Sequence, residues 1–244
     1  IQIGNAVPAV MARGIAVTVM DMAPQLMPNI FDQEMADYVR RQLQGKGLRI
    51  LTGTALLAIE GEGKVENVRT GTGTLPADMV VLAAGIRPAT GFLKDTGLEM
   101  ERGCIVTDEC QRTNLPDIYA VGDCALVKNR ITGKRQWSAM GSTANIAGRV
   151  LALNLGGEKN EYKGCLGTGV VKLAEGLNAA RTGLTEEQAK AEGRSVVSVV
   201  CVSDDKAHYY PDSGIFITKL IADKESHKLL GMQVIGGGAV DKMA

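Results

Sequence analysis

The sequence predicts an α/β protein that ends in an α+β module with an antiparallel sheet. Three observations lead to this fold class. Helix-like and strand-like apolar runs alternate along the first part of the chain, and β-rich runs separated by turns dominate the last part. Glycine is abundant, with 30 residues in 244, while aromatic residues make up only 4%. That balance is typical of α/β proteins whose backbone closely approaches a nucleotide.

The first part of the chain contains elements with clear boundaries. A helical pattern over residues 3–13 ends at Gly14, and Pro8 interrupts its regularity. The patterns that follow predict, in order, a buried strand at 15–20, a helix at 31–43, a strand from 50, a β meander at 54–78 and a buried parallel strand at 79–83.

The rest of the chain reads as shorter strands and further helices. The expected elements are a turn at 85–88, short strands at 105–106 and 118–121, a helix at 142–155, and β-rich runs at 196–202, 215–221 and 229–235. Thr185 and Gln188 have the spacing of a capping box, so a helix should begin there. Residues 223–228 should form the turn between the last two β-rich runs.

Composition excludes several function classes. The 27 basic and 27 acidic residues cancel, which argues against a nucleic-acid partner. No apolar run is long enough to span a membrane, so the sequence predicts a soluble, cytoplasmic protein. Five widely spaced cysteines and two histidines predict neither a disulfide framework nor a metal site.

A first motif consists of a helix, Gly14, the strand at 15–20 and then Asp21. In a dinucleotide-binding βαβ unit, an acid at the end of the second strand accepts hydrogen bonds from the adenine ribose, and it would repel a 2′-phosphate. Asp21 is therefore a candidate for NADH binding. An ordinary turn-starting aspartate remains the alternative, and the glycine-rich turn that should open the unit is absent from the sequence.

A second motif lies at the end of the apolar run 79–83, where Ala84 and Gly85 follow. Small residues at a strand end let a cofactor lie against the backbone, so both are candidate cofactor contacts. Alone, the pair is equally compatible with an ordinary turn.

The most specific string is Pro116-Asp117-Ile118-Tyr119-Ala120-Val121-Gly122-Asp123. Its glycine allows a polyol to pass close to the backbone, and its final carboxylate can accept a hydrogen bond from a hydroxyl. The string resembles the second FAD motif of the pyridine nucleotide–disulfide oxidoreductase superfamily. In that superfamily the aspartate, here Asp123, binds the ribityl chain of the flavin.

The resemblance covers essentially the whole chain and implies three parts. Residues 1–87 would be a truncated Rossmann-like NADH domain, 88–157 a partial FAD domain and 158–244 a truncated dimerisation domain. Both ends of the chain then read as cuts through a larger protein. The helix near Ser142 would direct the positive end of its dipole at the flavin. The implied cofactors are FAD and NADH, and the implied partners are a second copy of the chain and a small-molecule electron acceptor.

The string His208-Tyr209-Tyr210-Pro211 and the run at 231–236 resemble the branch of NADH oxidases, NADH peroxidases and coenzyme A-disulfide reductases. Tyr209 or Tyr210 could reach the partner subunit's active site and donate a proton, although packing in the dimer interface is a comparable alternative. The family's redox cysteine belongs to an N-terminal lobe, and none of the five cysteines occupies its position. The expected activity is hydride transfer from NADH through FAD to a disulfide, persulfide, oxygen or peroxide. The alternatives are a catalytically silent dimerising fragment and a ferredoxin-reductase-like electron-transfer flavoprotein.

Overall fold

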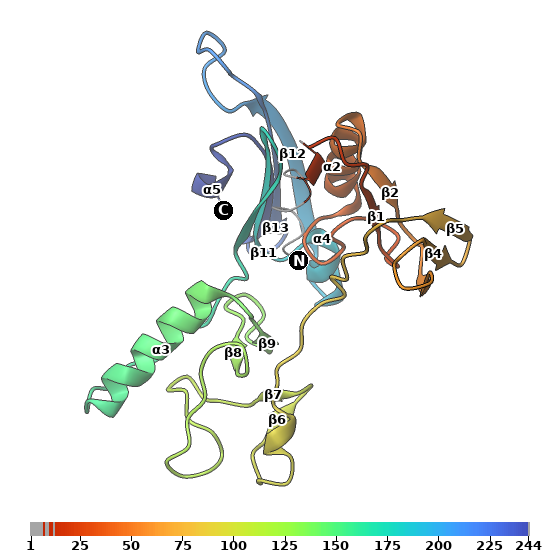
Figure 1. Ribbon diagram of the computed structural model, residues 1–244. Helices are drawn as coiled ribbons and strands as arrows, with labels where there is room; N and C mark the ends of the chain where they lie inside the picture. Colours follow the sequence, from red (N-terminus) through yellow and green to blue (C-terminus); the bar gives the residue numbers. More distant parts are fainter. Residues whose placement is uncertain (1–6, 8–9, 12, 244) are drawn as a thin grey trace. The chain divides into compact units, whose positions relative to one another are not determined.

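The computed structural model describes residue 7, residues 10–11 and residues 13–243 (Figure 1). The chain divides into two compact units, one formed by Ile1–Ala84 with Thr168–Ala244 and the other by Gly85–Gly167. Most of the predicted helix at 3–13 lies outside the described residues, although Gly14 has the positive φ of +75° that a helix-ending glycine adopts. The predicted domain boundaries, after residues 87 and 157, stay predictions.

The first unit opens with a small parallel β-α-β arrangement. Strand β1 (Thr18–Met20) pairs in parallel with β2 (Arg49–Leu51), and helix α2 (Gln33–Gly45) connects them. The helix is amphipathic and buries Met35 and Val39 on one face. This confirms the strand and the helix expected before and after residue 21, with bounds shifted by a few residues.

The predicted meander is also present. Strands β3 (Leu56–Glu60), β4 (Asn67–Thr70) and β5 (Gly73–Pro76) form a three-stranded antiparallel sheet. Gly61, at the turn after β3, has a φ of +149°, and a Cβ there would overlap the carbonyl oxygen of Lys64. Only glycine allows the chain to fold back so closely at this point.

The strand expected at residues 79–83 is not formed, so that prediction is wrong. The segment has no regular structure, and Met79 and Val81 are both 70% exposed. A buried parallel strand needs hydrogen-bonding neighbours, whereas the parallel sheet of the described residues consists of β1 and β2 alone. Among the described residues no strand pairs with this segment, so its apolar composition alone does not make it a strand.

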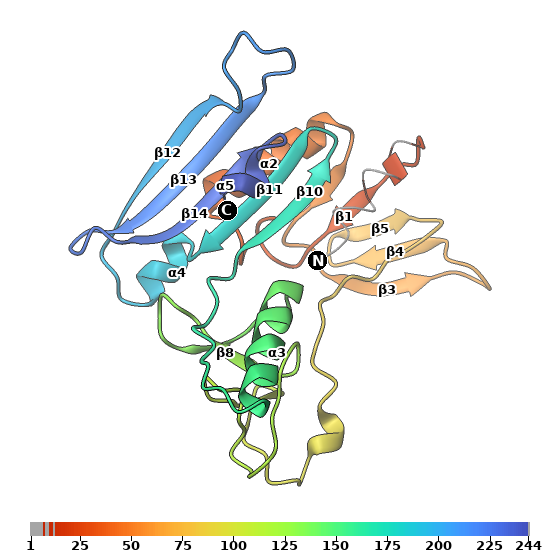
Figure 2. The ribbon, with the colours of Figure 1, turned by 90° about the vertical axis from the view of Figure 1, so that its left-hand side faces the viewer.

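The largest sheet belongs to the C-terminal part of the same unit (Figure 2). It has the strand order β10-β11-β14-β13-β12, and every pair is antiparallel. The strands are β10 (Gly169–Ala174), β11 (Leu177–Gly183), β12 (Val196–Asp204), β13 (Ile215–Asp223) and β14 (Leu229–Gly236). The antiparallel module expected from the three β-rich runs is thereby confirmed, with β10 and β11 extending it.

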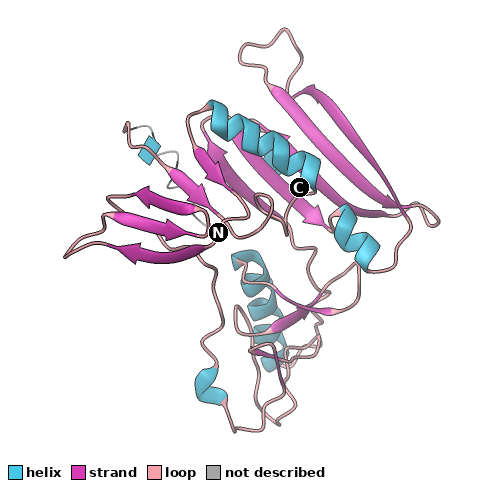
Figure 3. Cartoon of the chain, turned by 90° about the vertical axis from the view of Figure 1, so that its right-hand side faces the viewer, coloured by secondary structure: helices cyan, strands magenta, loops and turns pink. Residues whose placement is uncertain are grey.

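Helices cover both faces of this sheet (Figures 1 and 3). Buried residues of α2 share one hydrophobic core with Ala179, Ile217 and Ile235. On the opposite face, Val240 of α5 (Val240–Met243) packs with Phe216 and Val234. Neighbouring positions along the strands thus point to opposite faces, as the two-residue period of a β-strand requires.

Helix α4 (Glu186–Ala191) begins where the sequence predicts. The Thr185 hydroxyl accepts a hydrogen bond from the Gln188 amide, and the Gln188 side chain accepts one from the Thr185 amide. This reciprocal capping box satisfies N–H groups that the first turn of a helix leaves without partners.

The second unit holds α3 (Gly141–Leu155), a single turn η1 (Gly91–Leu93) and short antiparallel pairs. These pairs are formed by β6 (Met100–Glu101) with β7 (Cys104–Ile105) and by β8 (Leu126–Lys128) with β9 (Arg135–Trp137). The helix expected at 142–155 is confirmed, and β7 corresponds to the strand expected at 105–106.

The strand expected at residues 118–121 is not formed, which corrects that prediction. Only an isolated bridge pairs Arg112 with Tyr119. Asp117 has a φ of +60°, and the Thr113 hydroxyl donates to the Ile118 carbonyl at 2.9 Å. The turn at Asp117 folds the segment back onto residues 111–113, and this leaves no run of residues long enough for a strand.

Candidate functional site

Asp21 lies directly after β1, and its backbone is held on both sides. Its amide donates to the Leu51 carbonyl at 3.0 Å, and its carbonyl accepts from the Thr54 amide at 2.9 Å. One carboxylate oxygen accepts from the Ala23 amide at 2.9 Å, in a turn at the exposed end of the strand. The other oxygen has lone pairs for further hydroxyl donors, so the geometry suits an acid that contacts a ribose.

Ala84 and Gly85 are both exposed, and the boundary between the two units falls between them. Gly85 has a φ of +95°, a conformation that residues with a Cβ rarely adopt. The assignment of this pair to cofactor binding stays a prediction.

Gly122 and Asp123 form a tight turn that packs beside the start of α3. Gly122 has a φ of +85°, and a Cβ there would lie 3.8 Å from the Cβ of Ala144 in the first turn of the helix. The indole N–H of Trp137 donates to the Asp123 carbonyl at 2.7 Å, which fixes the turn while the Asp123 residue stays exposed.

The beginning of α3 has no side-chain cap. Its N-cap residue is Met140, which forms no side-chain hydrogen bond to the helix, and Ser142 in the first turn is exposed. Uncapped N–H groups and the positive end of the helix dipole favour an acceptor or a negative charge. The second unit thus brings the Gly122-Asp123 turn beside the first turn of α3, while the flavin roles expected for Gly122, Asp123 and Ser142 stay predictions.

Tyr209 and Tyr210 lie on the loop between β12 and β13, in the unit that contains Asp21. They are 75% and 56% exposed. Their ring centroids are 5.2 Å apart, and Tyr209 also makes an edge contact with His208 at 5.7 Å. The structure groups these aromatic rings with one another, and their predicted catalytic role remains a prediction.

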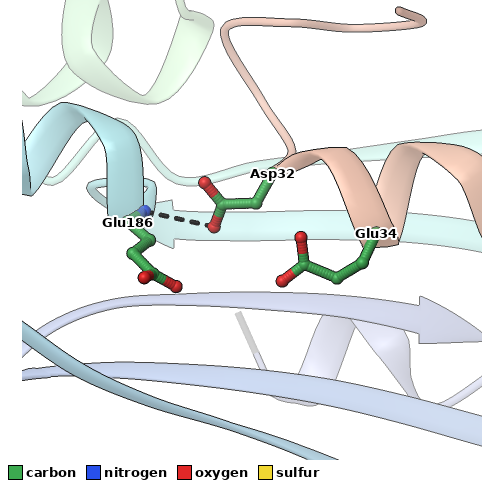
Figure 4. Close-up of side chains that lie close together, drawn as sticks. All are labelled: Asp32, Glu34 and Glu186. Carbon is green, nitrogen blue, oxygen red and sulfur yellow. Dashed lines mark hydrogen bonds between the residues drawn. The ribbon is translucent and has the colours of Figure 1, made fainter.

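Sequence reasoning missed a buried charged group, which we call the Lys219 cluster: Lys219, Asp32, Glu34, Glu186 and Gln233. The Lys219 side chain is only 3% exposed. Its ammonium lies 3.0 Å from Asp32 Oδ2 and 2.9 Å from Glu186 Oε2, and it also contacts the Glu34 carboxylate. Figure 4 shows the carboxylates of the cluster converging from α2 and α4. A lysine within the apolar run 215–221 is the sequence signal that could have revealed it.

The cluster has clear electrostatic consequences. Hydrogen bonds from Lys190, Ser198 and Lys219 lower the pKa of Glu186 to about 2. Burial by itself lowers the pKa of Lys219, but hydrogen bonds to Glu34, Glu186 and Asp32 more than offset this and raise it above the usual range. Ligand atoms of the three carboxylates lie within 4.8 Å of one another, a spacing that could suit a metal ion. The Lys219 ammonium contacts all three of these carboxylates.

The five cysteines are all free thiols. Cys104 is buried, and desolvation, followed by the nearby Cys124 and Glu101, raises the pKa of its thiol. A raised pKa disfavours the nucleophilic thiolate at this position.

Comparison with known proteins decides the family. The model of the family described as "Pyridine nucleotide-disulphide oxidoreductase" matches residues 6–148. The chain belongs to this family. The model of the family's dimerisation domain matches residues 175–244, which include most of the five-stranded sheet. The family is FAD-dependent and uses NAD(P)H.

The relatives place the chain in the branch of NADH oxidases and coenzyme A persulfide reductases. A CoA-dependent NAD(P)H sulfur oxidoreductase of Pyrococcus furiosus is 37% identical over 93% of the chain and 51% of its own length. An NADH oxidase of Methanocaldococcus jannaschii is 33% identical over 93% of the chain and 50% of its own length. The solved NAD-dependent persulfide reductase of A. fulgidus is 35% identical with a TM-score of 0.90, over 96% of this chain and 44% of that one.

The chain therefore spans about half the length of the curated relatives that it matches. Within the described part of the chain, no helix combines the length and apolar character needed to cross a membrane.

Proposed function

We propose that this chain supplies part of the NADH site, part of the flavin site and the dimerisation surface of an FAD-dependent oxidoreductase. In the whole protein, electrons would pass from NADH through FAD to a disulfide, persulfide, oxygen or peroxide. The observation that carries the proposal is the packing of the Gly122-Asp123 turn beside the uncapped start of α3.

The residues of this turn fit a flavin. Asp123 would accept a hydrogen bond from a ribityl hydroxyl, and Gly122 would let the ribityl chain pass close to the backbone. The first turn of α3, at Ser142, would stabilise negative charge on the flavin ring system, because its N–H groups have no side-chain cap.

The residues for NADH lie at two strand-end or loop positions. Asp21 would accept hydrogen bonds from the adenine ribose hydroxyls, and Ala84 and Gly85 would let the dinucleotide approach the backbone. A carboxylate at Asp21 would repel a 2′-phosphate, so we propose a preference for NADH over NADPH.

When bound, FAD would supply the chemistry of accepting a hydride from NADH and of passing an electron pair to the acceptor. The chain's own residues bind and orient the two cofactors. A sulfur species is the acceptor that the names of the P. furiosus and A. fulgidus relatives favour.

Assembly and proton transfer form the remaining parts of the proposal. The match to a dimerisation domain supports a homodimer. The exposed pair Tyr209 and Tyr210 would reach the partner subunit's active site and donate a proton there. We also propose that the protein is cytoplasmic, because its cysteines are free thiols.

Two other functions are distinguishable from this one. The 244 residues alone would be a catalytically silent dimerising scaffold if both cofactor sites need the rest of the protein. A ferredoxin-reductase-like flavoprotein would instead pass single electrons to a protein partner. Reduction of a low-molecular-weight persulfide or disulfide by the whole protein would argue against that alternative.

The deciding experiment measures flavin content. The Asp123→Asn substitution removes the charge-assisted hydrogen bond from the ribityl hydroxyl. After dialysis, the FAD content of the whole protein should therefore fall at least about tenfold relative to the wild type. Asp117→Asn is the matched control, since Asp117 is exposed on the same segment and asparagine tolerates its positive φ. Equal flavin retention in both variants would contradict the proposal, and a flavin absorbance band in the isolated chain would refute the silent scaffold.

A further inference from the structure

The Lys219 cluster joins parts of the chain that are distant in sequence. Asp32 and Glu34 lie at the start of α2, Glu186 opens α4, and Lys219 and Gln233 are cross-strand partners on β13 and β14. Asp32 lies within the match to the pyridine nucleotide-disulphide oxidoreductase model, and Lys219 lies within the match to the dimerisation domain. The cluster therefore connects two parts with different proposed tasks.

Asp32 makes hydrogen bonds to several other parts of the cluster. Its carboxylate accepts from the Gln233 side chain at 2.5 Å and from the backbone amides of Glu186 and Glu187 at 3.1 and 3.4 Å. Figure 4 marks the contact with the Glu186 amide. Asp32 thus sits at the N-terminus of α4 while also preceding α2, and both helix starts favour its negative charge.

The loop between Asp21 and Asp32 is held by the dimerisation domain at a second point. The carbonyl of Asn29 accepts from Arg181 Nη1 of β11 at 2.7 Å and from Gln188 Nε2 of α4 at 3.4 Å. The same loop carries Asp21 at its start. Contacts from the sheet and from α4 therefore restrain the loop that follows the proposed ribose-binding acid.

The charges of the cluster depend on one another. Lys219 is buried among carboxylates, and Lys190 is the other cation that contacts Glu186. Removing one partner from a buried ion pair leaves the remaining charge without compensation, which costs much more than the intact pair contributes. The loss of Lys219 should therefore release the start of α2 before it affects the rest of the sheet.

We propose that the Lys219 cluster is a positioning device by which the dimerisation domain holds the 22–32 loop and the start of α2. Lys219 and Asp32 are its positioning residues, and neither is among the residues proposed to contact a cofactor. The link to the nucleotide rests on the proposed role of Asp21, whereas the holding of α2 does not depend on it.

Amide hydrogen exchange of the nucleotide-free chain tests the device directly. Lys219→Met should accelerate exchange of the α2 amides on the order of 100-fold, while amides of β11, which pairs within the sheet, change by less than about tenfold. The matched control is Lys228→Met, which removes an exposed lysine from the turn after β13 and should leave both sets unchanged. Equal acceleration in α2 and β11, or none in α2, would overturn the proposal.

A second variant keeps the test decisive if Lys219→Met does not fold. Asp32→Asn keeps a side-chain oxygen for the α4 amides but removes the charge that pairs with Lys219, so the same selective exchange of α2 is expected, with a smaller factor. Uniform exchange across the unit would again overturn the proposal.

In the whole protein, each variant should raise the KM for NADH severalfold while kcat at saturating NADH stays within about twofold, because only positioning is lost. A fall in kcat without a change in KM would contradict positioning. Asp21→Ala separates the two proposals: if it leaves the KM for NADH unchanged, the nucleotide role of Asp21 fails, whatever the exchange data show.

Discussion

Gln233 on β14 exchanges two hydrogen bonds with Asp32, although the two residues lie 201 positions apart in the chain. The Asp32 amide donates to Gln233 Oε1 at 2.9 Å, and Gln233 Nε2 donates to the Asp32 carboxylate at 2.5 Å. A glutamine side chain fits here because its oxygen accepts from the Asp32 amide while its nitrogen donates to the Asp32 carboxylate.

Gln233→Glu should destabilise the unit that contains the five-stranded sheet. The new carboxylate keeps the acceptor but places a second negative charge against Asp32 in a buried site, which we expect to cost about 3 kcal/mol at pH 7.5. Urea unfolding measures the difference, and Gln44→Glu on the exposed side of α2 is the control with an effect within about 0.5 kcal/mol. Equal stability of both variants would contradict the arrangement.

Glu186 predicts a pH dependence of stability. Hydrogen bonds from Lys190, Ser198 and Lys219 lower the pKa of this carboxyl from 4.5 to about 2 in the folded state, so the unfolded chain binds its proton at higher pH. The resulting stabilisation, at most about 3 kcal/mol, is fully present above about pH 4.5 and is lost as the pH falls toward 2. Unfolding of wild type and Glu186→Gln across this range should show a stability gap that closes at acid pH. A gap that stays constant would contradict the pKa shift.

Gly231 predicts a steric effect on the sheet. A Cβ at this position of β14 would overlap the backbone of Leu184, so Gly231→Ala must displace one strand from its neighbour. We expect a loss of about 2–3 kcal/mol in the free energy of unfolding. Gly214→Ala is the matched control, because no atom lies within 4 Å of the added methyl group. A thermal shift that is the same for the two variants would count against this packing.

The proposed role of Asp21 predicts the coenzyme preference. In the whole protein, Asp21→Ala combined with Met22→Arg should shift the ratio of kcat/KM toward NADPH by at least about tenfold, because a repulsive carboxylate is exchanged for a guanidinium that can bind a 2′-phosphate. Met22 is exposed beside Asp21, so the arginine can be accommodated. Asp37→Ala serves as the control for the loss of an acid elsewhere on the unit. An unchanged preference would refute the assignment.

The two tyrosines predict separable effects. If one of them donates a proton, Tyr209→Phe or Tyr210→Phe should lower kcat of the whole protein by about 10²-fold or more and alter its pH profile, while the dimer persists. If both only pack in the interface, phenylalanine should preserve kcat, and replacement of both by serine should shift the mass measured by light scattering toward the monomer. Unaltered kcat in both phenylalanine variants would therefore rule out proton donation.

Sequence periodicity predicted the helices and strands whose buried and exposed faces follow from a pattern in their own consecutive residues. The helix α2, the capping box at Thr185 and the runs that became β12, β13 and β14 all carry their pattern within a few consecutive residues. At Gly122 the backbone has a φ of +85°, so a glycine is favoured there on local grounds alone.

Two of the failures share a physical cause, which is dependence on distant partners. The run at 79–83 has the composition of a parallel strand, but strand formation also needs a neighbour that composition does not reveal. The Lys219 cluster was missed for the same reason. A pattern shows that Lys219 lies on the buried face of β13, yet it does not show that Asp32 will meet it there.

The Lys219 cluster also limits how this chain can be recombined with its relatives. The two family models end and begin at residues 148 and 175, which would suggest a natural crossover point for chimaeras. Asp32 and Glu34 lie before that point, and Lys219, Glu186 and Gln233 lie after it. A hybrid that takes these residues from different parents would place side chains of the Lys219 cluster against partners that did not evolve together with them. The compact unit that contains the cluster therefore draws on both family-model matches. A hybrid preserves it only when both matched regions come from the same parent.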